Sequence, residues 1–342
     1  MDRRTHIKQM AGLTGAMLLG SPAKPFSTAD SPVTDGKIIT VTGEVSPSEL
    51  GITLPHEHIF ATFSDKPERY PTYPEKDLLD TVIPYFKKLK KLGIGTIVDA
   101  RSAYFGRHPE YLKRISEETE IHIITNTGYY GGAKGQYIPK NVAEETAQQV
   151  AQRWMREISR GIDETGIYPG IIKTAIEHRP MLDVDKKLIK AAAIAHKNTG
   201  LPIQSQIGNN LTGANNMISL LSDENVSIDA WTFVHAHLVP NASDLVPIAK
   251  MDGYLSYDGL NEDRAEKFLA DFKLFKTEGV FNRILLSHSG SVFNKDDIEA
   301  NYHFLVTDFK TRFLAYGFDE KDFKQITETN PANALTVKKR LL

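Results

Sequence analysis

The sequence contains no cysteine among its 342 residues. This absence excludes disulfide bonds and thiolate metal sites, so any metal would need histidine, carboxylate or modified lysine as its ligands. Positive and negative side chains also nearly balance, with a formal net charge of −2. A near-neutral chain lacks the basic surface that nucleic-acid binding requires. We therefore expect a small-molecule substrate and no nucleic-acid partner, and a homodimer is the assembly that we consider.

No apolar run near the N-terminus is long enough to span a membrane. Residues 3–8 are basic and begin with paired arginines, and residues 11–20 are apolar and small. About ten apolar residues are too few to cross a bilayer as a helix. The pattern is typical of a twin-arginine export signal, with a disordered basic leader as the alternative. We expect a signal over residues 1–29, a lead-in over 30–36, and a periplasmic or secreted protein without membrane contact after signal removal.

From residue 37 onward, short apolar segments alternate with amphipathic ones. Residues 37–42 are β-like and predict a short N-terminal β-hairpin. Strands are then expected at 52–58, 95–100, 121–125, 170–174, 202–206, 232–235, 254–257 and 284–287. Helices are expected at 76–92, 109–118, 142–162, 183–198, 214–221, 243–251, 261–277, 296–316 and 320–327. This alternation predicts an α/β fold, a (β/α)8 TIM barrel forming a single domain over 37–342, with a doubly wound open sheet as the alternative.

Two histidines, His56 and His58, end the first strand of the predicted barrel. In an extended strand, side chains at i and i+2 lie on the same face, so both imidazoles point the same way. Histidine is the commonest ligand for zinc-type metals. Active-site residues of such barrels lie at the carboxyl ends of strands. Other polar side chains stand at or near expected strand ends, although a single histidine there can be purely structural; they are Lys173, Gln206, His235, Asp258, His288 and Ser289.

Lys173 interrupts an apolar strand, where an unpaired ammonium group would be costly. Three solutions exist: a carboxylate partner, an amine of lowered pKa, or carboxylation by carbon dioxide to a carbamate. The carbamate is a bidentate oxygen ligand that can bridge two metals. The free amine would suit the lysine chemistry of aldolase-type barrels.

Several segments in order along the chain resemble the phosphotriesterase family of the amidohydrolase superfamily. They are residues 43–46, 50–58, 96–99, 163–173 and 329–332. The resemblance runs from about residue 38 to the C-terminus. It implies a metal-dependent hydrolase acting on organophosphate, lactone or related ester bonds. Members of this family typically hold two divalent metals, usually zinc.

The resemblance also implies a set of metal ligands. His56, His58, Lys173 and His235 match ligand positions of the family, and Lys173 matches its carboxylated bridging lysine. Gln206 stands where the family usually has a histidine ligand, and a neutral amide oxygen is a poorer zinc ligand than imidazole. We expect one metal to be held firmly by His56, His58 and carboxylated Lys173. A second metal would bind weakly or be absent, with His235 and Gln206 as its candidate ligands.

The family's proton-accepting aspartate is missing, because Ser289 occupies its position. Serine is neither an anionic ligand nor a base near neutral pH. His288 is the expected replacement, since histidine titrates near neutral pH, and Asp258 or His237 could also accept the proton. Glu57 should point away from the histidines. The residues expected to shape the substrate pocket are Tyr130, His235, His237 and Arg101.

The sequence thus predicts a zinc-type hydrolase in which hydroxide attacks a lactone or other carboxylic ester, or secondly a phosphoester. The alternative from another class is a degenerate barrel that binds a sugar-like or acidic ligand without turnover. Gln206 and Ser289 are the residues that favour this alternative.

Overall fold

The computed structural model describes residues 34–61, 67–294 and 301–342. The expected export signal, residues 1–29, lies outside the described residues. So do residues 30–33 of the expected lead-in and part of the segment predicted as helix 296–316. Within the described ranges, no helix combines the length and the hydrophobicity that crossing a membrane would need.

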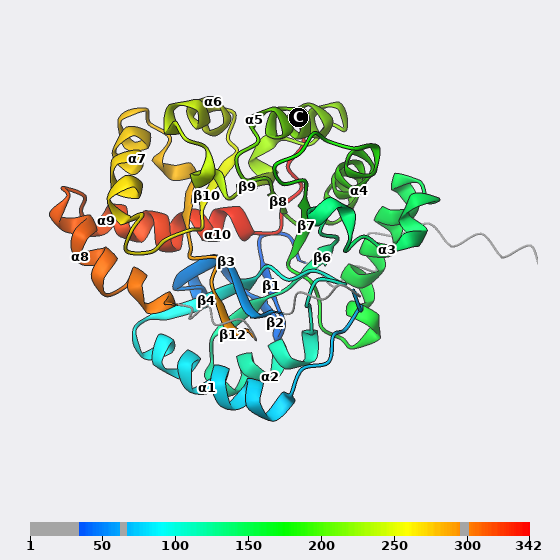
Figure 1. Ribbon diagram of the computed structural model, residues 1–342, viewed down its shortest axis with the longest axis horizontal. Helices are drawn as coiled ribbons and strands as arrows, with labels where there is room; N and C mark the ends of the chain where they lie inside the picture. The colour runs from blue at the N-terminus through cyan, green and yellow to red at the C-terminus, as the bar shows by residue number, and fades with distance from the viewer. Residues whose placement is uncertain (1–33, 62–66, 295–300) are drawn as a thin grey trace, which may run out of the picture.

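Parallel strands form a closed barrel at the centre of the molecule (Figure 1). Neighbours in chain order pair in parallel, and the last strand pairs with the first, which closes the ring. The strands are β3 (Ile52–Ala61), β4 (Ile94–Asp99), β5 (His122–Ile124) with its continuation β6 (Asn126–Gly128), β7 (Ile171–Ala175), β8 (Ile203–Gln206), β9 (Trp231–Val234), β10 (Tyr254–Tyr257), and β11 (Ile284–Leu286) followed by β12 (Ser291–Asn294). The predicted (β/α)8 barrel is confirmed, and the open-sheet alternative is wrong.

Helices surround this barrel on the outside (Figure 1). They are α1 (Glu75–Lys91), α2 (Pro109–Thr119), α3 (Ala147–Arg160), α4 (Asp183–Thr199), α5 (Leu211–Asp223), α6 (Val246–Lys250), α7 (Ala265–Thr277), α8 (Asp308–Ala315), α9 (Glu320–Lys324) and α10 (Asn330–Leu335). Their apolar faces pack on the strands in one large core.

Three helices begin four or more residues later than the sequence predicts. The helix predicted at 142–162 begins only at Ala147, because Thr146 caps it by accepting a hydrogen bond from the Gln149 backbone N–H at 3.2 Å. The helix predicted at 261–277 begins at Ala265. In the region predicted as helix 296–316, only 308–315 is α-helical among the described residues, with a 3₁₀ turn at 302–305 before it.

The predicted N-terminal hairpin closes one end of the barrel. Its strands are β1 (Ile38–Thr40) and β2 (Gly43–Val45), which pair antiparallel. Next to the hairpin, the Val41 backbone N–H donates to the Ile123 carbonyl at 2.8 Å, at the beginning of a barrel strand. Apolar side chains of the hairpin region, the strand starts and the C-terminal helix form one cluster; they are Ile38, Leu50, Val98, Ile124, Ile171 and Leu335. The amino-terminal end is therefore filled, and the functional groups lie at the carboxyl end.

A bulge in β3 sets the direction of the histidines. Leu54 pairs with Ile97 and Glu57 with Asp99, so β3 carries one extra residue between these pairs. Pro55 lies in this irregularity, where its missing N–H removes no regular ladder hydrogen bond. Beyond the bulge the strand alternates normally, so that His56 and His58 share one face and Glu57 takes the other.

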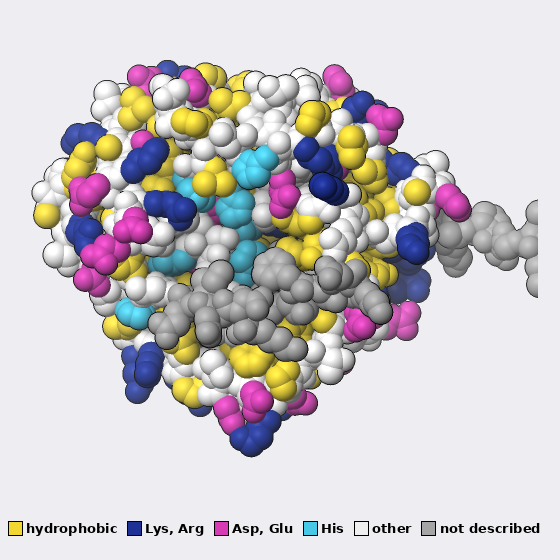
Figure 2. Space-filling view, in the orientation of Figure 1, with side chains coloured by type: hydrophobic (Ala, Val, Ile, Leu, Met, Phe, Trp, Pro, Cys, Tyr) yellow, Lys and Arg dark blue, Asp and Glu magenta, His cyan; other side chains and the backbone are white. Residues whose placement is uncertain are grey.

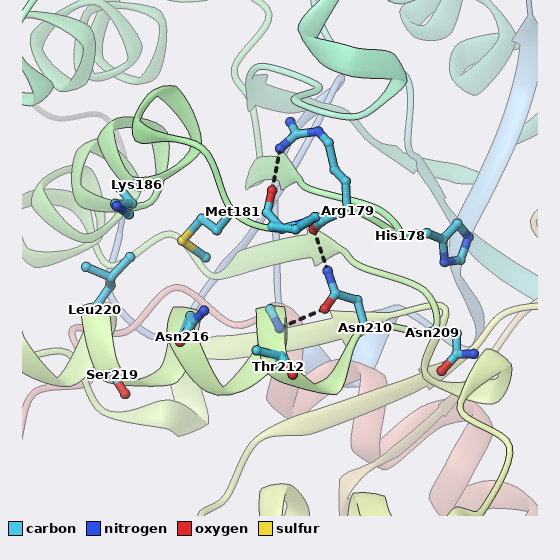
Figure 3. A pocket seen from close by; sticks show the side chains of 12 residues that line it. His178, Arg179, Met181, Lys186, Asn209, Asn210, Thr212, Asn216, Ser219 and Leu220 are labelled. Atoms are coloured by element: carbon cyan, nitrogen blue, oxygen red, sulfur yellow. Dashed lines mark hydrogen bonds between the residues drawn. The ribbon is translucent and has the colours of Figure 1, made fainter.

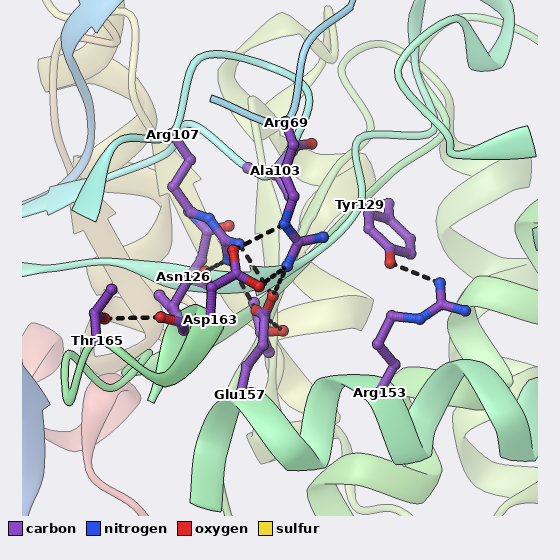
Figure 4. Close-up of polar contacts among 12 residues, drawn as sticks. Arg69, Ala103, Arg107, Asn126, Tyr129, Arg153, Glu157, Asp163 and Thr165 are labelled. Atoms are coloured by element: carbon purple, nitrogen blue, oxygen red, sulfur yellow. Dashed lines mark hydrogen bonds and ion pairs between the residues drawn. The ribbon is translucent and has the colours of Figure 1, made fainter. Parts of the chain in front are cut away.

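A buried charge network ties α3 to the strands and to the segment before α1 (Figure 4). The Glu157 carboxylate accepts hydrogen bonds from Arg107 at 3.0 and 3.1 Å, from Thr127 at 2.8 Å and from Arg69 at 2.8 Å. Burial acts to raise the pKa of Glu157, but Arg107 and Thr127 outweigh it and hold this pKa below its usual value. The carboxylate therefore stays ionised and anchors this side of the barrel.

Candidate active site

Three histidines from two strands converge at the carboxyl end of the barrel. The ring centroids of His56 and His58 lie 5.3 Å apart, and those of His56 and His235 lie 5.2 Å apart. Histidine side chains gather at the centre of the face drawn in Figure 2. His56 is fully buried and His58 is 9% exposed. The shared direction of His56 and His58, predicted from strand alternation, is what the structure shows.

Three ring nitrogens of His56 and His58 are available to a ligand. Neither nitrogen of His56 has a hydrogen-bond partner among the described residues, nor does Nδ1 of His58. Burial holds the pKa of both histidines well below the usual value, assisted by Lys173 at His56 and by Arg101 at His58. Both imidazoles are therefore neutral, which is the form that binds a metal. Buried polar atoms without partners are rare in folded proteins, and here they favour a bound cation.

His235 and Asp258 form a hydrogen-bonded pair beside His56. His235 follows β9 with a positive φ of 63°, and Asp258 follows β10. The Asp258 carboxylate lies 2.8 Å from His235 Nδ1 and accepts the His235 backbone N–H at 3.1 Å. This contact makes Nδ1 the protonated nitrogen and leaves Nε2 for the site. Ligand atoms of His56, His235 and Asp258 lie within 4.8 Å of one another, close enough to hold one metal ion.

Asp258 is completely buried, yet it is the anion of this site. Burial alone would raise the pKa of Asp258, but His235 and His237 hold it well below its usual value. His237 Nδ1 lies 3.0 Å from Asp258 Oδ1, and its ring packs on Tyr257 and Phe268. His237, expected to contact substrate, is buried against Asp258 and these two aromatic rings.

Lys173 is the third residue of β7 and has no exposed surface. The one hydrogen bond of its side chain among the described residues runs from Nζ to Gln206 Oε1, at 3.4 Å. No described carboxylate lies within ion-pair distance of it, so the structure does not provide the carboxylate partner that was one of the three alternatives for this lysine. Burial lowers the pKa of Lys173 to about 7. A substantial fraction of the amine is therefore neutral near physiological pH, which is the form that reacts with carbon dioxide.

Gln206 and Tyr130 continue this polar contact away from Lys173. Gln206 Nε2 donates to the Tyr130 hydroxyl at 3.2 Å, and the same hydroxyl donates to the carboxylate of Glu177. The Tyr130 ring is stacked on Phe105, with centroids 4.2 Å apart. Tyr130 is thus connected to Lys173 through Gln206. Hydrogen bonds to Gln206 and Glu177 fix the position of its hydroxyl.

Arg101 and Asp99 lie buried next to the histidines, at the end of β4. The Arg101 guanidinium lies over the Phe105 ring at 4.4 Å, and burial lowers the pKa of Arg101 to about 10. Burial also raises the pKa of Asp99 to about 7, and Asp99 Oδ1 accepts the Ile59 backbone N–H at 3.2 Å. Sequence reasoning predicted Arg101 but missed Asp99, although Asp99 stands at a strand end like the predicted residues. It also missed Glu177, for which no sequence pattern provides a signal.

His288 lies on the opposite side of the first strand from the histidine cluster. Its Nδ1 is 3.0 Å from the Glu57 carboxylate, and its ring is next to Tyr302. Glu57 points away from His56 and His58, as strand alternation predicts. The structure therefore does not bring His288 to the site, and Asp258 is the buried carboxylate beside the ligand nitrogens. Ser289 does reach the site, with Oγ 3.3 Å from His58 Nε2.

Glu57 acts as a clamp between the first and last strands. Its carboxylate accepts hydrogen bonds from Ser287 Oγ at 2.7 Å, from the His288 backbone N–H at 2.8 Å and from the Gly290 backbone N–H at 2.9 Å. We expect Glu57→Gln to lower the free energy of unfolding by about 1–3 kcal/mol, because buried donors lose a charged acceptor. Urea unfolding measures this change. Glu117→Gln, an exposed change on α2, is the control, and equal stability of the two variants would contradict the clamp.

Comparison with known proteins adds to this geometry. The model of the phosphotriesterase family matches residues 36–335. The chain belongs to the phosphotriesterase family. The match includes every site residue described above.

Curated relatives of this family member are distant but of similar length. A phosphotriesterase homology protein of Escherichia coli (strain K12) is 26% identical over 290 residues, covering 82% of this chain and 97% of the relative. The N-acetyltaurine hydrolase of Homo sapiens is 26% identical over 352 residues, covering 89% and 99%.

Solved structures show the same fold. The lactonase Lmo2620 from Listeria monocytogenes has a TM-score of 0.76 at 24% identity, covering 89% of this chain and all of that chain. A triple-substituted organophosphorus hydrolase from Deinococcus radiodurans has a TM-score of 0.78 at 24% identity, covering 90% and 99%. Family membership supports a hydrolytic enzyme of the phosphotriesterase type, and these structures show its fold.

Proposed function

We propose that this phosphotriesterase-family member is a metal-dependent hydrolase of lactones or other carboxylic esters, with phosphoesters as the second substrate class. The proposal depends mainly on the environment of the His56 ring. Both of its ring nitrogens are buried and lack a partner among the described residues, beside His235 and Asp258. Such a group of donors suits a divalent cation such as zinc.

The residues that would hold the metal are His56, His58 and carboxylated Lys173, with Nε2 of His235 as a further ligand. A divalent metal bound there supplies a Lewis acid and a water molecule of lowered pKa. Gln206 contacts Lys173 and therefore lies beside this ligand set, but its amide oxygen is a poor ligand. These donors support one strongly held metal rather than two.

The remaining residues position the reacting groups and accept the proton. Asp258 fixes the tautomer of His235, and its buried carboxylate is the group beside the histidines that would accept the proton. Ser289 cannot perform this role, because a hydroxyl is not basic near pH 7. Tyr130 holds Gln206 by a hydrogen bond and so limits its rotation. Arg101, buried next to His58, favours a substrate that carries or develops negative charge.

The names of related proteins define a panel of substrates. They include a lactonase, an organophosphorus hydrolase and N-acetyltaurine hydrolases, whose names specify a lactone, an organophosphorus compound and an amide. The hydrolysed bond therefore differs among proteins of this fold. The panel for this chain should contain one lactone, one carboxylic ester, one phosphotriester and N-acetyltaurine.

Metal analysis combined with this panel tests the proposal. Protein purified with zinc and bicarbonate should hold about one metal per chain and hydrolyse a member of the panel. His56→Ala should lose both the metal and the activity, whereas His303→Ala, which removes an exposed histidine, should lose neither. Stable folded protein with neither metal nor turnover would overturn the proposal and favour the non-catalytic binding barrel.

A further inference from the structure

A second concave feature lies beside the candidate active site. It is a cavity of about 660 Å³ between the segment after β7, residues 176–182, and the first turns of α5. A volume of this size lies in the range of small-molecule pockets. The residues that follow β7 and β8 belong to the carboxyl end of the barrel, so the cavity opens on the same end as the histidines.

Hydrogen bonds hold the walls of this cavity in place. Asn210 caps α5 by accepting the Gly213 N–H at 2.9 Å, and its Nδ2 donates to the carbonyls of Glu177 at 2.9 Å and Arg179 at 2.8 Å. Arg179 in turn donates to both oxygens of buried Asp185. The loop after β7 and the start of α5 are thus cross-linked, and the cavity is formed before any ligand binds.

One end of the cavity lies close to the candidate active site. His178 packs against Gly208, where an added Cβ would lie 2.6 Å from the His178 ring. Gly208 is two residues beyond Gln206, and its N–H donates to the carbonyl of Val234, the residue before His235. In Figure 3, His178 and Asn209 lie at one end of the cavity and Lys186 and Leu220 at the other. The cavity is therefore elongated and leads outward from the site.

The side chains that line the cavity define the chemistry of a ligand. None of the described lining residues is an aspartate or glutamate, whereas His178, Arg179 and Lys186 are basic. Arg179 is already paired. Among the described residues, the Lys186 ammonium pairs with Asp183 alone, at 2.9 Å, and the two side chains are 51% and 97% exposed. Exposed ion pairs of this kind contribute little, so Lys186 can exchange its partner.

The middle of the cavity combines apolar and hydrogen-bonding groups. Met181 and Leu220 supply apolar surface, and Asn209, Thr212 and Asn216 supply amides and a hydroxyl. No hydrogen bond joins the side chains of these three polar residues to another described residue. This lining suits a chain-like molecule with an apolar body better than a compact ion.

We propose that this cavity binds the tail of an elongated amphipathic substrate whose far end carries an anionic group, and that Lys186 pairs with that group. The inference rests on the proposed hydrolase function, because the scissile ester would lie at the histidines while the tail extends past His178. The ligand class is an ester or lactone bearing a chain with a terminal carboxylate or similar anion.

Two matched esters test the inference. Monomethyl suberate has an anionic end, and methyl octanoate has the same ester and chain length with a neutral end. Lys186→Gln should raise KM for monomethyl suberate about fivefold, the size expected for one partly exposed ion pair, with kcat unchanged. KM for methyl octanoate should stay unchanged. Asn216→Trp, which fills the middle of the cavity, should raise KM for both esters.

The control is Lys190→Gln, which removes an exposed lysine of α4 outside the cavity. A KM increase of the same size in this variant would overturn the inference, because it would reflect net charge alone. If both esters are hydrolysed and neither Lys186→Gln nor Asn216→Trp has an effect, the proposed role of the cavity is wrong. The proposed hydrolase function would then still stand. Calorimetric titration with octanoate needs no turnover. If octanoate binding depends on Lys186 and Asn216 while no ester is hydrolysed, the cavity is supported and the hydrolase proposal fails.

Discussion

Lys173→Met is expected to abolish hydrolysis while leaving the barrel folded. Methionine fills nearly the same volume as lysine without a polar end, so the strand β7 should keep its packing. The variant loses the group that, after carboxylation, would supply an oxygen ligand to the metal. We expect kcat/KM to fall by at least about 10²- to 10³-fold, the loss typical of removing one preorganised polar group from an active site.

The same variant should change how stability depends on pH in metal-free protein without bicarbonate. The pKa of Lys173 falls from its ordinary value of 10.5 to about 7 in the folded chain, because burial disfavours the ammonium form. Between these pH values the unfolded chain binds more protons than the folded chain, so the free energy of unfolding rises as pH increases from about 7 toward 10. At pH 7 the lowered pKa of Lys173 still destabilises the folded wild type by most of its full amount. Lys173→Met should therefore be more stable by a few kcal/mol, since one pKa unit corresponds to about 1.4 kcal/mol.

Urea unfolding between pH 7 and pH 9.5 measures this difference. Lys190→Met, which changes an exposed lysine of α4, should follow the wild-type pH dependence and serves as the control. Labelled bicarbonate provides a separate measurement, because a carbamate on Lys173 gives a ¹³C signal that the Lys173→Met variant must lack. A variant that retains wild-type hydrolysis would disprove the role of Lys173, whatever its stability.

Asp258→Asn should give the second large effect. Asparagine keeps the shape of the side chain, but its amide can donate to His235 Nδ1 and so favour the wrong tautomer. Loss of the carboxylate behind a metal-binding histidine typically costs about 10- to 100-fold in metal affinity or activity. If Asp258 also accepts the proton, the loss in kcat should reach about 10²- to 10⁴-fold.

The comparison of metal content with kcat separates these two roles of Asp258. Restoring metal occupancy with excess zinc should recover activity only if Asp258 acts solely through metal binding. Asp322→Asn, in the capping contact of α9 far along the chain from the site, is the control and should leave both quantities unchanged. A variant at Asp258 with normal metal content and normal kcat would show that another group accepts the proton. His288→Ala should leave kcat unchanged, since His288 faces Glu57.

The sequence allowed the barrel and the first part of the site to be predicted, because local patterns decide them. Apolar segments of strand length alternating with amphipathic helices leave few arrangements that bury all apolar faces. The common direction of His56 and His58 follows from the two-residue period of a strand, whatever surrounds it. Lys173 was recognisable for a similar reason, since a charged residue inside an apolar strand is costly and demands an explanation.

Directions of side chains beyond the strand ends were decided only by the tertiary structure. His235 and Ser289 have positive φ values of 63° and 55°, which no local pattern in the sequence predicts. The choice of Asp258 over His288 depends on Glu57, which holds the loop after β11 through contacts more than two hundred residues apart in the chain. The cavity next to the site likewise arises from two separate loops held together by Asn210. Periodicity determines which face of a strand a residue takes, whereas the direction of a loop residue depends on packing against distant segments.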